Sequence, residues 1–212
     1  MILITPAILT DNFDEFERQA HRLETIFSYA QIDVMDGKLV PTTSFAEVER
    51  VAEVKTGLRY EVHLMVEHPY EELLRWGEIR NVSRIIFHAE AKSDPRAIIE
   101  ECRARGLEVG VALNPETPTS AIDAYVHDLD LVQFMTVHPG RQGAPFLPEM
   151  KEKITTFCQT PHRPRVSVDG GINQDTIHEV ASWGVEIVNV GSYFAQAPDV
   201  AEALIKLRDA LN

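Results

Sequence analysis

The feature that most constrains this chain is a regular alternation of short apolar runs with longer amphipathic segments along all 212 residues. The short runs are rich in Val, Ile and aromatic residues, which predicts β-strands. They cover residues 2–9, 29–35, 59–65, 83–88, 108–113, 131–135, 165–168 and 186–190. The segments between them have helical spacing, as at Phe13, Phe16, Ala20 and Leu23, or at Phe45, Val48, Val51 and Ala52.

The number and rhythm of these units indicate the fold. About eight strand–helix units are what a (β/α)₈ TIM barrel requires. A doubly wound open sheet gives the same alternation and is the alternative. The barrel is favoured because the rhythm continues to the C-terminus and because polar residues follow many strands instead of one switch point. No Pro-rich or Gly-rich linker divides the chain. We therefore expect an α/β protein with a single barrel domain over residues 1–212.

Composition and net charge limit the classes of molecule that this protein can bind. A formal charge of −13 argues against nucleic acid and anionic membranes, since both would repel such a surface. A small anionic ligand is still allowed, because local dipoles decide its binding. Two cysteines are too few for a disulfide framework, and the apolar N-terminus lacks a basic leader. No run is long enough to span a bilayer. These observations predict a cytoplasmic protein.

The C-terminal ends of the predicted strands carry the chemistry, because a (β/α)₈ barrel assembles its active site there. The candidates at these ends are Asp33, Met35, Asp36, His63, Met65, His88, Glu90, Asn114, Met135, Thr136, Asp169, Gly191 and Ser192. Any one of them has a structural explanation, such as a helix cap or core filling. Two aspartates and a histidine at one barrel mouth, however, have the ligand types of a divalent-metal site. The same aspartates are candidate acid and base.

Glycines follow the last three strands, in HPGRQG (138–143), VDGG (168–171) and VGS (190–192). Barrels often bind a phosphate in the loops after strands seven and eight, where backbone N–H groups and a helix N-terminus receive it. Glycine suits this use because a Cβ would block close approach of the backbone. The alternative is that these glycines only form turns. We expect phosphate-binding loops after strands 6, 7 and 8.

Several motifs resemble those of the ribulose-phosphate 3-epimerase family, in family order and spacing across nearly the whole chain. They are PAIL, IDVMDGKLVP, VHLMVEHP, FHAEA, GVALNPETP, MTVHPG, VDGGIN and VGSYF. The resemblance implies a (β/α)₈ barrel and a small phosphorylated ketose as substrate. It also implies a metal-assisted 1,1-proton-transfer epimerase and a homo-oligomer.

The resemblance also assigns roles to single positions. Asp33 and Asp169 match the pair of acid/base carboxylates, which also ligate one divalent ion (Zn, Fe or Mn), and His63 matches a further ligand. The pocket around the reacting carbon is matched by Met35, Met65 and Met135. Phosphate-binding positions are matched by Gly170, Gly171, Gly191 and Ser192, with Gly140 and Gly143 in the neighbouring loop. Two carboxylates on opposite sides of a flat enediolate could invert a carbon without the substrate turning over.

The sequence departs from the family pattern at the site. Gln31 replaces a metal-ligating His, and its neutral amide is either a weaker ligand or a hydrogen-bond partner of Asp33. Ala7 stands where a small hydroxyl residue is usual, and Lys38 where the family often has His. In HPGRQG, Arg141 has a planar fork that suits a phosphate and is a candidate to compensate for an altered glycine loop.

Three functions fit these departures. The first is an epimerase with a weakened or absent metal, acting on D-ribulose 5-phosphate or on another ketose phosphate such as allulose 6-phosphate. The second is a related sugar-phosphate synthase or decarboxylase. Such enzymes carry a Lys where this chain has Met35, which counts against this alternative. The third is a non-catalytic barrel that binds a phosphorylated metabolite. Retention of both Asp33 and Asp169 favours the first, because unused buried carboxylates are costly.

Overall fold

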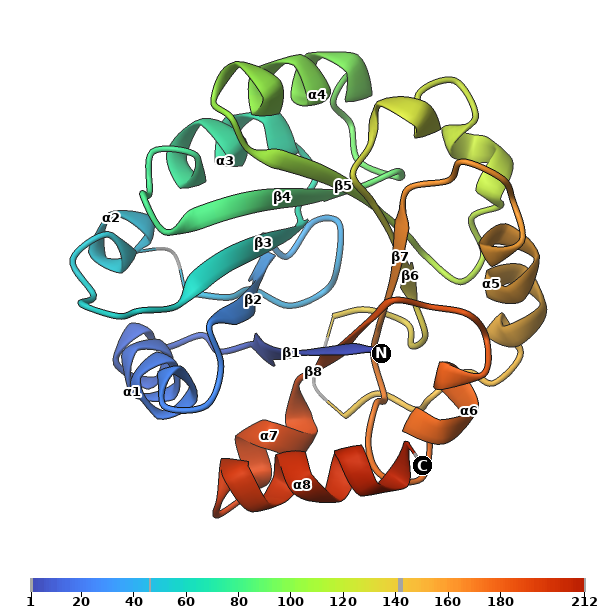
Figure 1. Ribbon diagram of the computed structural model, residues 1–212. Coiled ribbons are helices and arrows are strands. Elements are labelled where there is room, and N and C mark those ends of the chain that lie inside the picture. The colour runs from blue at the N-terminus through green and yellow to red at the C-terminus, as the bar shows by residue number, and fades with distance from the viewer. Residues whose placement is uncertain (1, 46, 141–142, 212) are drawn as a thin grey trace.

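The structure is a computed structural model that describes residues 2–45, 47–140 and 143–211. All eight predicted strands are present, and parallel pairing runs from β1 to β8 and closes from β8 back to β1. This closure confirms the predicted barrel, which the helices surround as an outer ring (Figure 1). The strands are β1 Leu3–Ile8, β2 Tyr29–Met35, β3 Arg59–Met65, β4 Val82–His88, β5 Glu108–Leu113, β6 Leu131–Met135, β7 Arg165–Asp169 and β8 Ile187–Val190.

The helices pack one apolar face against the barrel. In α1, the Asn12 side chain caps the first turn by accepting from the Glu15 amide, and Phe16 and Ala20 are fully buried. The helices are α1 Phe13–Glu24, α2 Val48–Val51, α3 Pro69–Trp76, α4 Pro95–Ala104, α5 Met150–Cys158, α6 Ile177–Ala181, α7 Ser192–Gln196 and α8 Val200–Ala210. No helix in the described ranges is both long and apolar enough to cross a membrane.

Two connections differ from the predicted pattern. The helix expected between β5 and β6 is replaced by two 3₁₀ turns, Thr119–Ile122 and Val126–Asp128. Pro118 directly precedes the first turn, and the segment is rich in residues that favour turns over helix. The helix after β2 is also shorter than expected. Phe45 precedes it and packs 5.0 Å from the Phe16 ring, while Ala52 follows it and is exposed.

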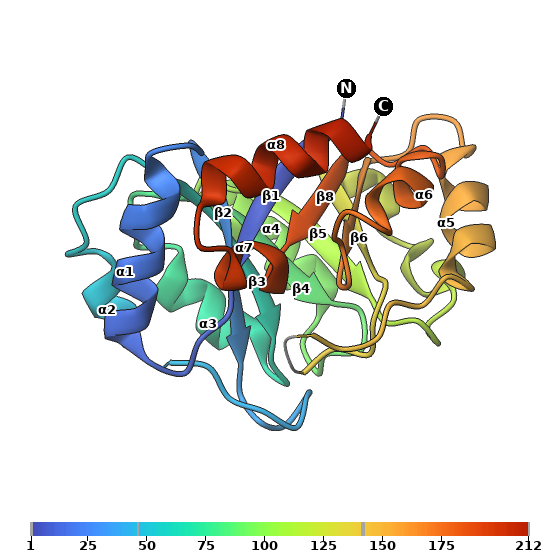
Figure 2. The same ribbon diagram turned by 90° about the horizontal axis from the view of Figure 1, so that it is seen from below.

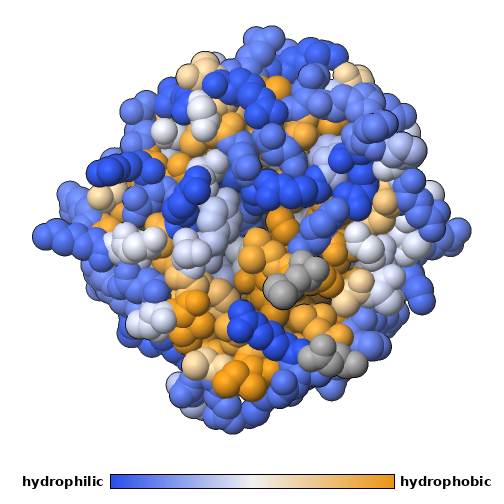
Figure 3. Space-filling model, in the orientation of Figure 1, coloured by the Kyte–Doolittle hydropathy of each residue, from blue (hydrophilic) through white to orange (hydrophobic). Residues whose placement is uncertain are grey.

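The two ends of the barrel differ in character. The chain termini lie on the side where the strands begin, and the long loop after β2 extends from the opposite side (Figure 2). Figure 3 views the end where the strands begin, and apolar side chains gather there around the start of β1 and the end of α8. Leu3, the first residue of β1, is 51% exposed. The strand ends that carry the candidate site therefore face away from this apolar patch.

An ionic cluster fills the inside of the barrel near the strand starts. The Arg84 guanidinium donates to Glu61 Oε2 at 2.5 Å and, through Nε, to Glu108 Oε2 at 2.9 Å. Arg84 and Glu61 are 4% and 1% exposed. Burial raises the pKa of Glu61, and Arg84 opposes this shift. The pair therefore needs both of its members, since either charge alone would be buried without compensation.

We expect Arg84→Met to lower the free energy of unfolding by about 3–5 kcal/mol, because it leaves Glu61 without its partner. Urea unfolding followed by circular dichroism measures this loss. Arg103→Met is the matched control, since Arg103 pairs with Asp130 at a half-exposed site and its loss should cost about 0–1 kcal/mol. Equal effects of the two substitutions would contradict the structural role given to Arg84.

Candidate active site

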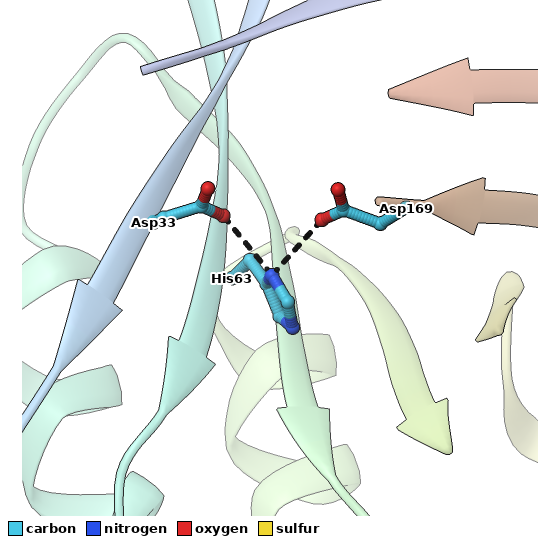
Figure 4. A group of neighbouring side chains, drawn as sticks. All are labelled: Asp33, His63 and Asp169. Atoms are coloured by element: carbon cyan, nitrogen blue, oxygen red, sulfur yellow. Dashed lines mark hydrogen bonds and ion pairs between the residues drawn. The ribbon is translucent and has the colours of Figure 1, made fainter. Parts of the chain in front are cut away.

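Three side chains meet at the C-terminal ends of β2, β3 and β7: Asp33, His63 and Asp169. Asp33 lies opposite His63 in the register of β2 and β3, and Asp169 ends β7. The His63 Nδ1 atom is 3.0 Å from Asp33 Oδ1 and 3.4 Å from Asp169 Oδ2. Figure 4 shows the two carboxylates pointing toward each other from opposite sides of the imidazole. The structure thus brings together two acids that are far apart in the chain.

Burial and like charge determine the protonation of this group. Asp33 and Asp169 are 7% and 8% exposed, and His63 is fully buried. Burial, followed by repulsion from Asp169, raises the pKa of Asp33 above its ordinary value. Burial alone would lower the pKa of His63, but its hydrogen bonds with the two carboxylates outweigh burial and raise the pKa to about 9. The imidazole therefore carries a proton at neutral pH and offsets negative charge on the pair.

Gln31 contacts both acids through one amide nitrogen. Its Nε2 donates to Asp33 Oδ1 at 2.8 Å and to Asp169 Oδ2 at 2.6 Å. The predicted hydrogen bond with Asp33 is confirmed. Its N–H₂ group and not its oxygen faces the carboxylates, so the ligation of a metal by Gln31 that the sequence also allowed would require the amide to turn.

A series of hydrogen bonds continues from His63 to His88 at the end of the neighbouring strand β4 and on to Glu90. His63 Nε2 lies 2.9 Å from His88 Nε2, and His88 Nδ1 lies 3.1 Å from Glu90 Oε2. Burial opposes ionisation of Glu90, but hydrogen bonds from His88 and Thr117 outweigh burial and lower its pKa to about 2. An ionised Glu90 holds the proton of a neutral His88 on Nδ1, which leaves His88 Nε2 to accept from His63. These hydrogen bonds orient the His63 ring so that its Nδ1 atom points toward the two acids.

The donors present fit a divalent metal ion. One oxygen of Asp33, one oxygen of Asp169 and one nitrogen of His63 all lie within 4.8 Å of one another. Carboxylate oxygen and imidazole nitrogen are ligands of Zn²⁺, Fe²⁺ and Mn²⁺. These three residues are therefore the ones that would hold the ion.

A cavity opens beside the acid pair and encloses about 550 Å³ of space, part of it open to solvent. Met65 and Met135 line it, as do Ala7 and Ser192. The third predicted methionine, Met35, is not among the lining residues. It packs against Val40 and Met65, and the Thr42 hydroxyl donates to its sulfur. Two of the three methionines thus face the space where a substrate would lie.

The glycine loops after β6, β7 and β8 form the other wall of the cavity. Gly170 has a φ of +115°, and a Cβ there would lie 2.4 Å from Val137 Cγ2. Gly171 has a φ of +69° and would meet Phe146 at 2.8 Å. These two glycines are therefore required by packing inside the protein, in addition to any ligand. At Gly191 the nearest atom to an added Cβ is 3.8 Å away, which is ordinary van der Waals contact, so packing inside the protein does not require glycine there.

The remaining predicted positions behave differently from one another. Gly140 and Gly143 line the cavity, whereas Arg141 lies outside the described residues. Asp36 accepts from the amides of Lys38, Leu39 and Glu67, which confirms that it orders its loop. These bonds outweigh its burial and lower its pKa.

Two residues that contact the site from inside the barrel were not predicted. Asn189 Nδ2 donates to Gln31 Oε1 at 2.6 Å, and Gln133 Nε2 donates to Asp169 Oδ2 at 3.2 Å. Both stand in the middle of otherwise apolar strands, in LVQFM and IVNV. A polar residue at an inward position of a buried strand was the available signal, because the barrel interior accepts it only when it is hydrogen-bonded.

The fold defines the class of the protein as a (β/α)₈ barrel. Among solved structures, 3-hexulose-6-phosphate synthase from Salmonella typhimurium matches with a TM-score of 0.74 and 15% identity, over 99% of this chain and 98% of that one. The 3-keto-L-gulonate-6-phosphate decarboxylase from Vibrio cholerae matches with a TM-score of 0.72 and 11% identity, over 99% and 97% of the two chains. At these identities the likeness shows the fold alone.

Sequence comparison defines the family. The model of the Ribulose-phosphate 3 epimerase family matches residues 3–195. A ribulose-phosphate 3-epimerase of Methanocaldococcus jannaschii is 33% identical over 216 residues, which cover 99% of this chain and 91% of the relative. One of Treponema pallidum is 32% identical over 200 residues, or 90% of each chain. The chain belongs to the ribulose-phosphate 3-epimerase family.

We expect metal binding to release about one proton at pH 7.5, because His63 is protonated below its pKa of about 9 and must lose the Nδ1 proton to ligate. The affinity for Zn²⁺ should therefore rise by about tenfold per pH unit up to pH 9 and level off above it. Calorimetric titration in two buffers of different ionisation enthalpy measures the released proton. In His63→Gln this release should disappear, and its persistence there would contradict the assignment.

Proposed function

We propose that the protein is a ketose-phosphate 3-epimerase that interconverts D-ribulose 5-phosphate and D-xylulose 5-phosphate with the help of a divalent metal. The observation that carries the proposal is the position of Asp33 and Asp169, which face each other across one gap at the mouth of the barrel. Family membership supports it, since the relatives are named ribulose-phosphate 3-epimerases.

The two acids have different tasks in one direction of the reaction. In the direction described here Asp33 starts with a proton and Asp169 without one, an assignment that the raised pKa of Asp33 favours. The Asp169 carboxylate removes the proton from C3 on one face of the sugar, and the electron pair moves onto the carbonyl oxygen to give an enediolate. Asp33 then gives its proton to C3 on the opposite face, which inverts the centre. Asp33 ends ionised and Asp169 protonated, and the reverse reaction uses them in exchanged roles.

The surroundings favour the charged intermediate. A divalent ion held by Asp33, His63 and Asp169 would stabilise the negative charge on the enediolate oxygens. The Met65 and Met135 side chains, each 3% exposed, give the reacting carbon an apolar wall that excludes water. Because water is excluded, the enediolate receives its proton from one of the two acids and not directly from solvent.

The phosphate of the sugar belongs in the glycine loops. Gly170, Gly171, Gly191 and Ser192 line the same cavity as the two acids. Gly191 and Ser192 stand at the start of α7, where backbone N–H groups have no partner inside the helix and attract an anion. Because Gly191 lines the cavity and has no side chain, a ligand can approach this backbone closely.

We expect the substitutions Asp33→Asn and Asp169→Asn each to lower deuterium entry at C3 of D-ribulose 5-phosphate by about 10²–10⁴-fold, because each removes one of the two proton carriers. The measurement is proton NMR of the sugar in D₂O, with Mn²⁺ or Zn²⁺ supplied. Asp123→Asn is the control, since Asp123 is exposed in the β5–β6 connection and should leave exchange unchanged.

Further outcomes separate the function from its substrate. Exchange with D-allulose 6-phosphate but not with D-ribulose 5-phosphate would keep the proposed chemistry and change the sugar. Full exchange in both Asn variants, or none with any ketose phosphate in a protein that binds inorganic phosphate, would overturn the proposal.

A further inference from the structure

Three buried amide side chains lie inside the barrel next to the acid pair: Gln31 on β2, Gln133 on β6 and Asn189 on β8. They are 0%, 0% and 1% exposed. None of them is a metal ligand or a proton carrier in the proposed function. Buried amides are retained only when they are hydrogen-bonded, and their hydrogen bonds here lead to the two carboxylates.

The orientation of the Gln31 amide follows from its neighbours. An amide nitrogen has two N–H groups, and those of Gln31 are directed at Asp33 and Asp169. The Gln31 oxygen faces Asn189 Nδ2, 2.6 Å away. Rotating the Gln31 amide by half a turn would place its oxygen against two carboxylate oxygens and its N–H groups against the N–H groups of Asn189. Every one of these new contacts would be repulsive.

Asn189 is held in its turn by Gln133. Asn189 Nδ2 also donates to Gln133 Oε1 at 2.9 Å, and Ser167 Oγ donates to the same oxygen at 3.2 Å. Gln133 Nε2 donates to Asp169 Oδ2, which fixes which end of that amide faces the acid. Asn189 therefore cannot turn to follow Gln31 without losing the bond to Gln133. We call the contact between Asn189 Nδ2 and Gln31 Oε1 the amide lock.

The locked Gln31 acts on the atoms that would bind a metal. Asp33 Oδ1 and Asp169 Oδ2, which accept from Gln31, are the same oxygens that lie nearest His63 Nδ1. The Gln31 N–H groups bring positive partial charge to these oxygens and occupy their lone pairs. A cation between the acids and His63 would meet those N–H groups, and the lock prevents Gln31 from offering its oxygen to the ion instead.

We propose that Gln31, oriented by Asn189, competes with a divalent ion for the two carboxylates, so that the amide lock sets the metal affinity of the site. The same contacts hold the acid pair together in protein prepared without metal. This inference rests on the metal site of the proposed function, but not on which sugar is bound.

The test is the affinity for Zn²⁺, measured at pH 7.5 by competition with a chromophoric chelator. Gln31→Leu removes the competing N–H groups and should bind Zn²⁺ about tenfold more tightly, equivalent to about 1.4 kcal/mol. Asn189→Leu frees Gln31 to turn its oxygen to the ion and should also raise the affinity. In the double variant, Asn189→Leu should add nothing to Gln31→Leu, because the lock acts only through Gln31.

Ser83→Ala is the control, since this hydroxyl at the start of β4 donates to Tyr29 and lies outside the network of the three amides, and the Zn²⁺ affinity of this variant should equal that of the unchanged protein. Structural damage would lower the affinity, so a rise cannot come from a disturbed fold. Weaker or unchanged binding in Gln31→Leu would overturn the inference, as would Asn189→Leu without effect. Deuterium entry at C3 is measured separately, so failure of the proposed epimerase function can be distinguished from failure of the amide-lock proposal.

Discussion

Asp33 and Asp169 repel each other when both are ionised, and they lie in a part of the barrel that water hardly reaches. Their mutual repulsion must be met by positive charge or by N–H groups, since neither acid can turn to bulk solvent. His63 has a raised pKa, so its protonated imidazole supplies positive charge, and Gln31 donates one hydrogen bond to each acid. The polar interior near the strand ends can be understood as the set of groups that this pair of acids requires.

The barrel supplies those groups because parallel strands end at one rim. Inward side chains of β2, β3 and β7 reach the same point there, although they are distant in sequence. The opposite end of the barrel holds a separate charge cluster around Arg84. The barrel interior also contains a buried apolar cluster of Ile86, Ala112, Leu131 and Ile187. Stability and chemistry thus depend on different parts of one closed sheet.

Sequence patterns predicted the strands closely, because runs of β-branched residues at regular intervals have few other structures open to them. They also identified Asp33, His63 and Asp169, because position at a strand end determines position at the barrel mouth. They could not orient Gln31, since its direction depends on Asn189 and Asp169 on other strands. The β5–β6 connection was mispredicted because prolines and turn-forming residues outweighed apolar spacing there.

The amide lock joins the second strand of the chain to the last. Gln31 is made early in synthesis, but Asn189 and Asp169, which fix it, lie close to the C-terminus. A chain that still lacks β8 already has both acids, but it has neither Asn189 nor a closed barrel to hold Gln31 between them. The arrangement around the two acids is therefore completed only when the final strand pairs with β1 and closes the barrel.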